Sequence, residues 1–173
     1  MCIRDRTNIG DARIVGLEAY AEMDLSKFWT DTATETPSDF RLSVFGNLSV
    51  LNGRYTSGAS DFDGNEVELV PPFSLKTGFD FRWKDLSLAY QFGYVYQHFS
   101  DATNAEFVAD ATRGVIPSYH VQDVSVSYYY KWFRFSAGLN NLTNERYFTR
   151  RATAYPGPGI IPADGRSYYV GFA

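Results

Sequence analysis

The chain has 173 residues and carries 16 Lys and Arg against 20 Asp and Glu, a formal net charge of −4. This acidic balance excludes the basic footprint of a nucleic-acid-binding domain, and no run approaches the roughly 18 consecutive apolar residues that a membrane-spanning helix requires. Because hydrophobic residues reach 45% without forming long runs, they must alternate with polar residues, which is typical of β-strands.

The chain begins with MCIRDR, which resembles translated adaptor read-through. We interpret residues 1–6 as a non-native leader and leave them out of the fold prediction. The single cysteine, Cys2, lies in this leader. Neither a disulfide framework nor thiol chemistry is therefore predicted for the rest of the chain.

In the first half of the chain, apolar and polar residues alternate over three segments. The alternation is loose over Arg13–Leu25 and Phe40–Val50, and strict over Phe73–Trp83. Each segment is predicted to be a strand with one apolar and one polar face. The faces of the third would carry Phe73, Leu75, Phe79, Phe81 and Trp83 on one side, and Ser74, Lys76, Gly78, Asp80 and Arg82 on the other.

The second half alternates over four more segments, which are Leu86–Phe99, Val121–Tyr130, Phe133–Leu139 and Ser167–Phe172. The pattern therefore predicts about seven antiparallel strands and no long helix. The predicted apolar face includes Leu86, Leu88, Tyr90, Phe92 and Tyr94 of the first segment, and Val124, Val126, Tyr128 and Tyr130 of the second.

The connections between these strands alternate in length. Trp83–Asp85 and Tyr130–Trp132 are tight reversals, whereas the long connections are Tyr55–Pro72, Ser100–Tyr119 and Asn144–Arg166. Short turns at one end and long loops at the other are typical of an outer-membrane barrel. The segment Phe28–Asp39 falls on the short side and is longer than that rule prefers.

A soluble antiparallel sandwich or jelly roll also has alternating strands. Three features favour the membrane barrel. Several predicted strands run ten residues or more, whereas strands of soluble domains usually run about 5 to 6. Aromatic residues gather at strand ends, as interfacial girdles do, and the polar faces carry charged residues such as Arg41, Asp80 and Arg134.

The most specific stretch is NNLTNERYF followed by GRSYYVGF, supported by GVIPSYHVQDVSVSYYY in the middle of the chain. In these stretches the chain resembles the C-terminal part of the barrel of a TonB-dependent outer-membrane receptor, and is most similar to ferric-citrate-type iron transporters. The resemblance implies an all-β, up-and-down antiparallel sheet. Residues 7–173 would form the C-terminal part of a barrel of about 22 strands, without the plug domain and the earlier strands.

The resemblance also implies a function and partners. The complete protein would import a ferric siderophore with energy delivered through TonB, whose complex would be contacted by a segment N-terminal to this chain. Outer-membrane lipid and lipopolysaccharide would surround the barrel, and no nucleic acid or cofactor is expected. A passive porin-like barrel and a soluble carbohydrate-binding sandwich are the alternatives.

Candidate ligand-binding residues lie in the last long loop. These are Arg150 and Arg151, with Tyr147 and Tyr155 nearby. Guanidinium groups bind carboxylate-rich anions well, and a citrate-type ferric chelate is such an anion. In the alternative interpretation, the two arginines pair with acidic loop residues or with lipopolysaccharide phosphates.

Other chemistry finds little support in the sequence. His98 and His120 are the only histidines, and a metal site needs three or four convergent ligands, so no metal site is predicted. No grouping of Ser, His and carboxylate stands out, so no enzyme is predicted.

Overall fold

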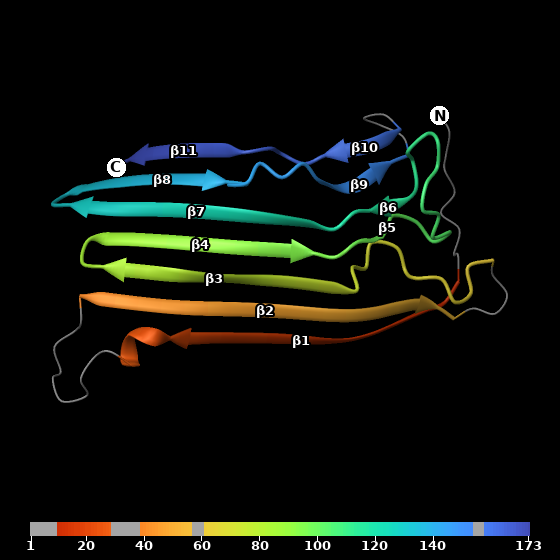
Figure 1. Cartoon of the computed structure of the whole chain (residues 1–173), viewed down its shortest axis with the longest axis horizontal. Coiled ribbons are helices and arrows are strands. Elements are labelled where there is room, and N and C mark those ends of the chain that lie inside the picture. The colour runs from red at the N-terminus through yellow and green to blue at the C-terminus, as the bar shows by residue number, and fades with distance from the viewer. Residues whose placement is uncertain (1–9, 29–38, 57–60, 154–157) are drawn as a thin grey trace.

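The computed structural model describes residues 10–28, 39–56, 61–153 and 158–173. Its main feature is one seven-stranded antiparallel sheet with the order β1-β2-β3-β4-β7-β8-β11 (Figure 1). The strands are β1 (Ala12–Asp24), β2 (Phe40–Tyr55), β3 (Phe73–Trp83), β4 (Leu86–Val95), β7 (Tyr119–Tyr130), β8 (Phe133–Asn140) and β11 (Ser167–Phe172). The predicted up-and-down sheet is confirmed.

Two small hairpins and a short helix complete the described structure. One hairpin pairs β5 (His98–Phe99) with β6 (Val115–Ile116), and the other pairs β9 (Phe148–Ala152) with β10 (Gly159–Pro162). The 3-10 helix η1 (Leu25–Phe28) follows β1. No helix in the described part of the chain is long and apolar enough to cross a membrane.

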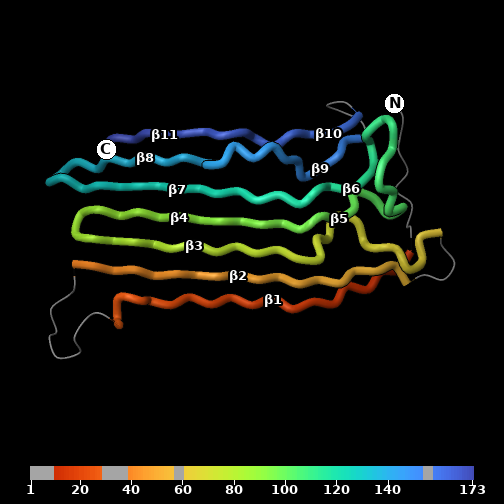
Figure 2. Tube along the Cα trace, in the orientation of Figure 1, coloured from red at the N-terminus to blue at the C-terminus, as the bar shows by residue number. Residues whose placement is uncertain are grey.

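The connections between β2 and β3, β4 and β7, and β8 and β11 are long, and all three leave the main sheet at the same end (Figures 1 and 2). At the other end, β3 and β4 are joined by Lys84 and Asp85, and β7 and β8 by Lys131 and Trp132. Lys84 and Lys131 have φ angles of 52° and 55°, which allow the chain to reverse within two residues. The predicted alternation of short and long connections is confirmed, while most of the connection Phe28–Asp39 lies outside the described residues.

Two predicted strand ends are wrong by four residues or more, and the other strand bounds differ from the prediction by at most two residues. The strand predicted over Leu86–Phe99 ends at Val95, because His98 and Phe99 leave the main sheet to pair with β6. The strand predicted to end at Val50 continues to Tyr55, because its last residues pair with the start of β1. At 16 residues, β2 is longer than the about 9 to 11 residues that span a bilayer.

The strand register gathers apolar residues on one face of the sheet. One row across the strands consists of Leu42, Phe81, Leu88, Val126, Ala137 and Val170. The next row, on the opposite face, consists of Ser43, Asp80, Ala89, Ser125, Gly138 and Tyr169. The predicted division into an apolar and a polar face is confirmed.

The apolar face has no second layer among the described residues. Val170 is 82% exposed and Val126 is 37% exposed. Buried apolar residues of the described chain occur instead at the long-loop end, and these are Tyr55, Ala102, Ile116 and Ala152. A sandwich would bury this apolar face against another sheet, and the described residues form no such sheet over it.

Candidate ligand-binding surface on the polar face and long loops

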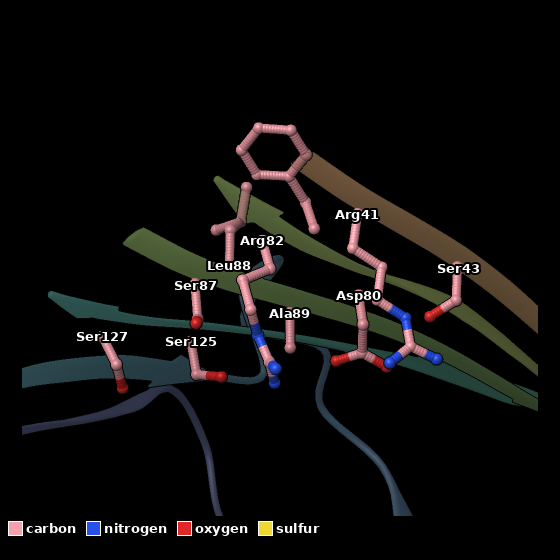
Figure 3. Close-up of a pocket in the computed structure, with 10 residues that line it drawn as sticks. Arg41, Ser43, Asp80, Arg82, Ser87, Leu88, Ala89, Ser125 and Ser127 are labelled. Carbon is pink, nitrogen blue, oxygen red and sulfur yellow. The ribbon is translucent and has the colours of Figure 1, made fainter. Parts of the chain in front are cut away.

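The polar face carries a hollow of about 250 Å³ near the short-turn end. Figure 3 shows Arg41, Asp80 and Arg82 projecting from the same side of the sheet, while Leu88 projects from the opposite side. Small side chains on β4 and β7 leave room for the hollow, and these are Ser87, Ala89, Ser125 and Ser127.

The two arginines of this hollow differ in their partners. Arg41 and Arg82 are cross-strand neighbours on the same face, an arrangement that is unfavourable for like charges. The Nε of Arg41 lies 3.2 Å from Asp24 Oδ2, whereas Arg82 forms no ion pair with a described residue. The hollow therefore presents the charged groups of Arg82 and Asp80 beside hydroxyl groups, a surface suited to water.

A second hollow of about 280 Å³ continues along the polar face. It shares Asp80, Ala89 and Ser125 with the first, and adds Gln91 and Asp123 nearer the long loops. The polar face thus carries one hydrophilic groove that leads from the short-turn end toward the long loops.

The long-loop end of the polar face is marked by two stacked tyrosines. The rings of Tyr119 and Tyr147 lie 4.5 Å apart with an interplanar angle of 21°. Tyr119 shares the polar face with its cross-strand partner Val95, and Val95 with Ser74. The structure therefore places the predicted site residue Tyr147 at the mouth of the polar face.

The two predicted arginines have different surroundings. Arg151 donates through Nη1 to the carbonyl of Ala111 at 3.0 Å and through Nη2 to the carbonyl of Val115 at 2.8 Å. Its guanidinium also lies 5.0 Å from the ring centroid of Phe148. Arg150 is exposed, and successive strand residues point to opposite faces. The predicted arginine pair is therefore split, and Tyr155 lies outside the described residues.

Arg151 joins the β8–β11 connection to the β4–β7 connection, and Asn104 joins the β4–β7 connection to the β2–β3 connection. The Asn104 side chain accepts a hydrogen bond from the backbone N–H of Glu66 at 2.6 Å and donates to the carbonyl of Glu66 at 2.9 Å. The connections between β2 and β3, β4 and β7, and β8 and β11 are thus joined in series by side chains that bind backbone groups.

The carbonyl that receives Arg151 lies in a fixed turn. Asp110 accepts hydrogen bonds from the backbone N–H and the hydroxyl of Thr112 at 3.0 and 2.8 Å. These bonds favour the carboxylate and hold the pKa of Asp110 below its ordinary value. Ala111, between them, has a φ of 56°, a conformation that costs free energy for a residue other than glycine.

The sequence interpretation missed a third hollow, of about 450 Å³, beside the β9–β10 hairpin. Its charged lining residues are Glu145 and Arg146, and its aromatic ones are Tyr147 and Phe148. The signal was the run of charged and aromatic residues in NERYF, but the opposite wall comes from residues 160–165, which sequence proximity does not reveal.

The described residues contain no group of three or more His, Cys, Asp or Glu side chains that could hold a metal ion. Nδ1 of His98, a buried residue, lies 3.1 Å from the carbonyl oxygen of Tyr96. His120 stacks on Phe92 with ring centroids 6.1 Å apart. Each histidine therefore contacts a nearby residue of the fold, His98 through the carbonyl of Tyr96 and His120 through the ring of Phe92.

Residues 4–142 match the family model described as TonB dependent receptor-like, beta-barrel. The chain belongs to this family. Members are outer-membrane proteins of Gram-negative bacteria, which assigns this chain to that membrane. The family consists of receptors and transporters, and the resemblance stated from the sequence is confirmed.

Solved structures of this family share the fold. The ferric citrate transporter FecA in its unliganded form matches with a TM-score of 0.79 and 23% identity, over 94% of this chain and 24% of FecA. The ferric yersiniabactin uptake receptor FyuA from Yersinia pestis matches with a TM-score of 0.69 and 20% identity, over 95% of this chain and 23% of FyuA. The copper transporter OprC matches with a TM-score of 0.63 and 18% identity, over 94% of this chain and 23% of OprC.

The chain spans about a quarter of the length of these structures. At identities of 23% and below, the likeness shows the fold alone. No curated protein sequence matches the chain.

Proposed function

We propose that the chain is the C-terminal part of the barrel of a receptor that imports a ferric siderophore with energy delivered through TonB. The observation that supports this most directly is the family match over residues 4–142. In this proposal residues 7–173 belong to the barrel and residues 1–6 are a non-native leader, although the family match begins at residue 4, inside that leader.

The proposal gives each face of the sheet a partner. The apolar face contacts lipid, because its exposed side chains suit a hydrocarbon environment. At the short-turn end, Trp83, Tyr130 and Trp132 are 53%, 51% and 93% exposed, which fits a girdle at the membrane interface. The polar face borders the lumen, lipopolysaccharide surrounds the long-loop end, and TonB is contacted by a segment outside this chain.

The proposed ligand contacts lie in the last long loop. Arg150 is exposed and offers a planar guanidinium to a carboxylate of the chelate. Tyr147 lies at the mouth of the polar face, and Tyr155 belongs to the same loop. Arg151 supports the site by fixing the loop to its neighbour, since both of its terminal nitrogens are engaged with carbonyl oxygens.

The test is iron uptake by cells that carry the complete receptor. Cells supplied with iron-55 ferric citrate are compared with and without TonB, with receptor abundance at the surface measured in both. We expect uptake that requires both the receptor and TonB. Receptor-dependent uptake of equal rate without TonB would instead indicate the passive porin-like barrel.

A further inference from the structure

The hollow beside the β9–β10 hairpin lies between two segments of the last long loop. Residues 144–148 form one wall and residues 160–165 contribute the other. Its volume of about 450 Å³ falls within the roughly 300 to 1,000 Å³ of small-molecule sites. It is separate from the two hollows of the sheet, since it shares no lining residue with them.

Both walls are fixed by hydrogen bonds from two asparagines. Asn141, only 3% exposed, donates through Nδ2 to the carbonyls of Glu145 at 2.9 Å and Asp164 at 3.3 Å, and accepts from the N–H of Glu145 at 2.7 Å. Asn144 Oδ1 accepts from the N–H of Arg166 at 3.0 Å.

A backbone bond also joins the walls, from the N–H of Ala163 to the carbonyl of Tyr147 at 2.9 Å. The pocket therefore exists before a ligand arrives, which lowers the ordering cost of binding.

The lining combines one cation, Arg146, and one carboxylate, that of Glu145, with aromatic and aliphatic surface. Arg146 is exposed and forms no ion pair with a described residue. Beside it lie the rings of Tyr147 and Phe148, and across from them Ile160 and Pro162. A guanidinium binds a carboxylate through two parallel hydrogen bonds, while the other four side chains offer flat and apolar contacts.

We infer that this pocket binds an aromatic carboxylate, either free or as one arm of a larger chelate. Arg146 binds the carboxylate, and Tyr147, Phe148 and Ile160 enclose the ring. The inference deepens the proposed function and rests on it for the source of the ligand, because an imported chelate would first meet the long loops. Binding of an aromatic carboxylate itself requires neither iron nor TonB.

The test measures direct binding to the complete receptor in detergent, with sodium benzoate as the probe and ligand-detected NMR as the readout. We expect saturable benzoate binding, with acetate and benzyl alcohol each binding at least tenfold more weakly because each lacks one half of the recognised group. Arg146→Gln should weaken benzoate binding at least tenfold, while Arg113→Gln, at an exposed arginine of the neighbouring loop, should leave it unchanged.

A second variant tests the pocket without touching its charge. Ile160→Trp fills the space with a larger side chain at an exposed position and should abolish benzoate binding while Arg146 remains. Barrel assembly is checked for each variant by heat-dependent mobility on gels. Unchanged benzoate affinity in either Arg146→Gln or Ile160→Trp, or acetate binding as tight as benzoate, would overturn the inference. Loss of TonB-dependent uptake would leave it standing, so the two proposals fail separately.

Discussion

The ring of Tyr169 occupies the space in which any side chain at position 138 would lie. Gly138 and Tyr169 are cross-strand partners on the polar face, and a Cβ built on Gly138 would lie 2.2 Å from Cε1 and 2.4 Å from Cζ of Tyr169. Phe45 covers its partner Gly78 in the same way, with its Cε1 2.9 Å from a Cβ built there. Large side chains are thereby held against the sheet, and the groove stays open.

Gly138→Ala should therefore destabilise the barrel. The added methyl group displaces the Tyr169 ring, and overpacking of this kind costs about 1 to 3 kcal/mol. The measurement is urea-induced unfolding of the complete receptor in lipid vesicles. Gly46→Ala is the matched control, because a Cβ built on Gly46 meets nothing within 4 Å. Equal effects of the two substitutions would show that the ring does not depend on the glycine.

The lipid-facing side of the sheet can be tested at two adjacent residues of β7. Val126 lies in the apolar row and Ser125 in the polar row. Val126→Arg should cost about 2 to 4 kcal/mol near the bilayer midplane, whereas Ser125→Arg, which faces the groove, should cost far less. Folding of the complete receptor into lipid vesicles gives both values. If Ser125→Arg proved the more damaging change, the two faces would have to be exchanged on every strand.

The hydrogen bonds of Arg151 predict a loss of loop order when that side chain is removed. Arg151→Ala deletes both donors to the loop between β4 and β7, so hydrogen exchange at residues 108–116 should accelerate. Arg150→Ala should leave that exchange unchanged, because its exposed side chain has no such bonds to the loop. Equal rates of hydrogen exchange at residues 108–116 in Arg151→Ala and Arg150→Ala would contradict the role given to Arg151.

The proposed contact between Arg150 and the ligand can be tested by measuring affinity. A direct charge-assisted hydrogen bond contributes about 1.5 to 3 kcal/mol, so Arg150→Ala should lower the affinity of the complete receptor for ferric citrate at least tenfold. Surface abundance should stay constant, since Arg150 lies outside the main sheet. Full affinity after Arg150→Ala would exclude this contact, and a fall in abundance would mark the residue as needed for folding.

The sequence predicted the main sheet because period-2 alternation records which face of each strand is apolar. The bounds of β3 and β11 agree with the prediction, and the two tight turns follow. The β5–β6 hairpin was not predicted, because strands of two residues are too short to show a period and because their pairing depends on contacts across a long loop.

Less of the candidate site could be predicted from the sequence, because the geometry of the site depends on backbone groups. Arg150 and Arg151 look equivalent in the chain, and only the course of β9 sends them to opposite sides. The partners of Arg151 are carbonyl oxygens 36 and 40 residues away, which residue types do not encode. The pocket around Arg146 could not be predicted either, because its walls come from two separate segments, residues 144–148 and 160–165.

The proposed function requires one orientation of the barrel, with the long loops outside the cell and the tight turns in the periplasm. Single cysteines placed at Arg150 and at Lys131 in an otherwise cysteine-free complete receptor can be treated in intact cells with a membrane-impermeant maleimide. We predict labelling of Arg150→Cys in intact cells, and labelling of Lys131→Cys only after the outer membrane is permeabilised. Labelling of Lys131→Cys in intact cells, with Arg150→Cys protected until permeabilisation, would contradict the orientation and every extracellular contact proposed from it.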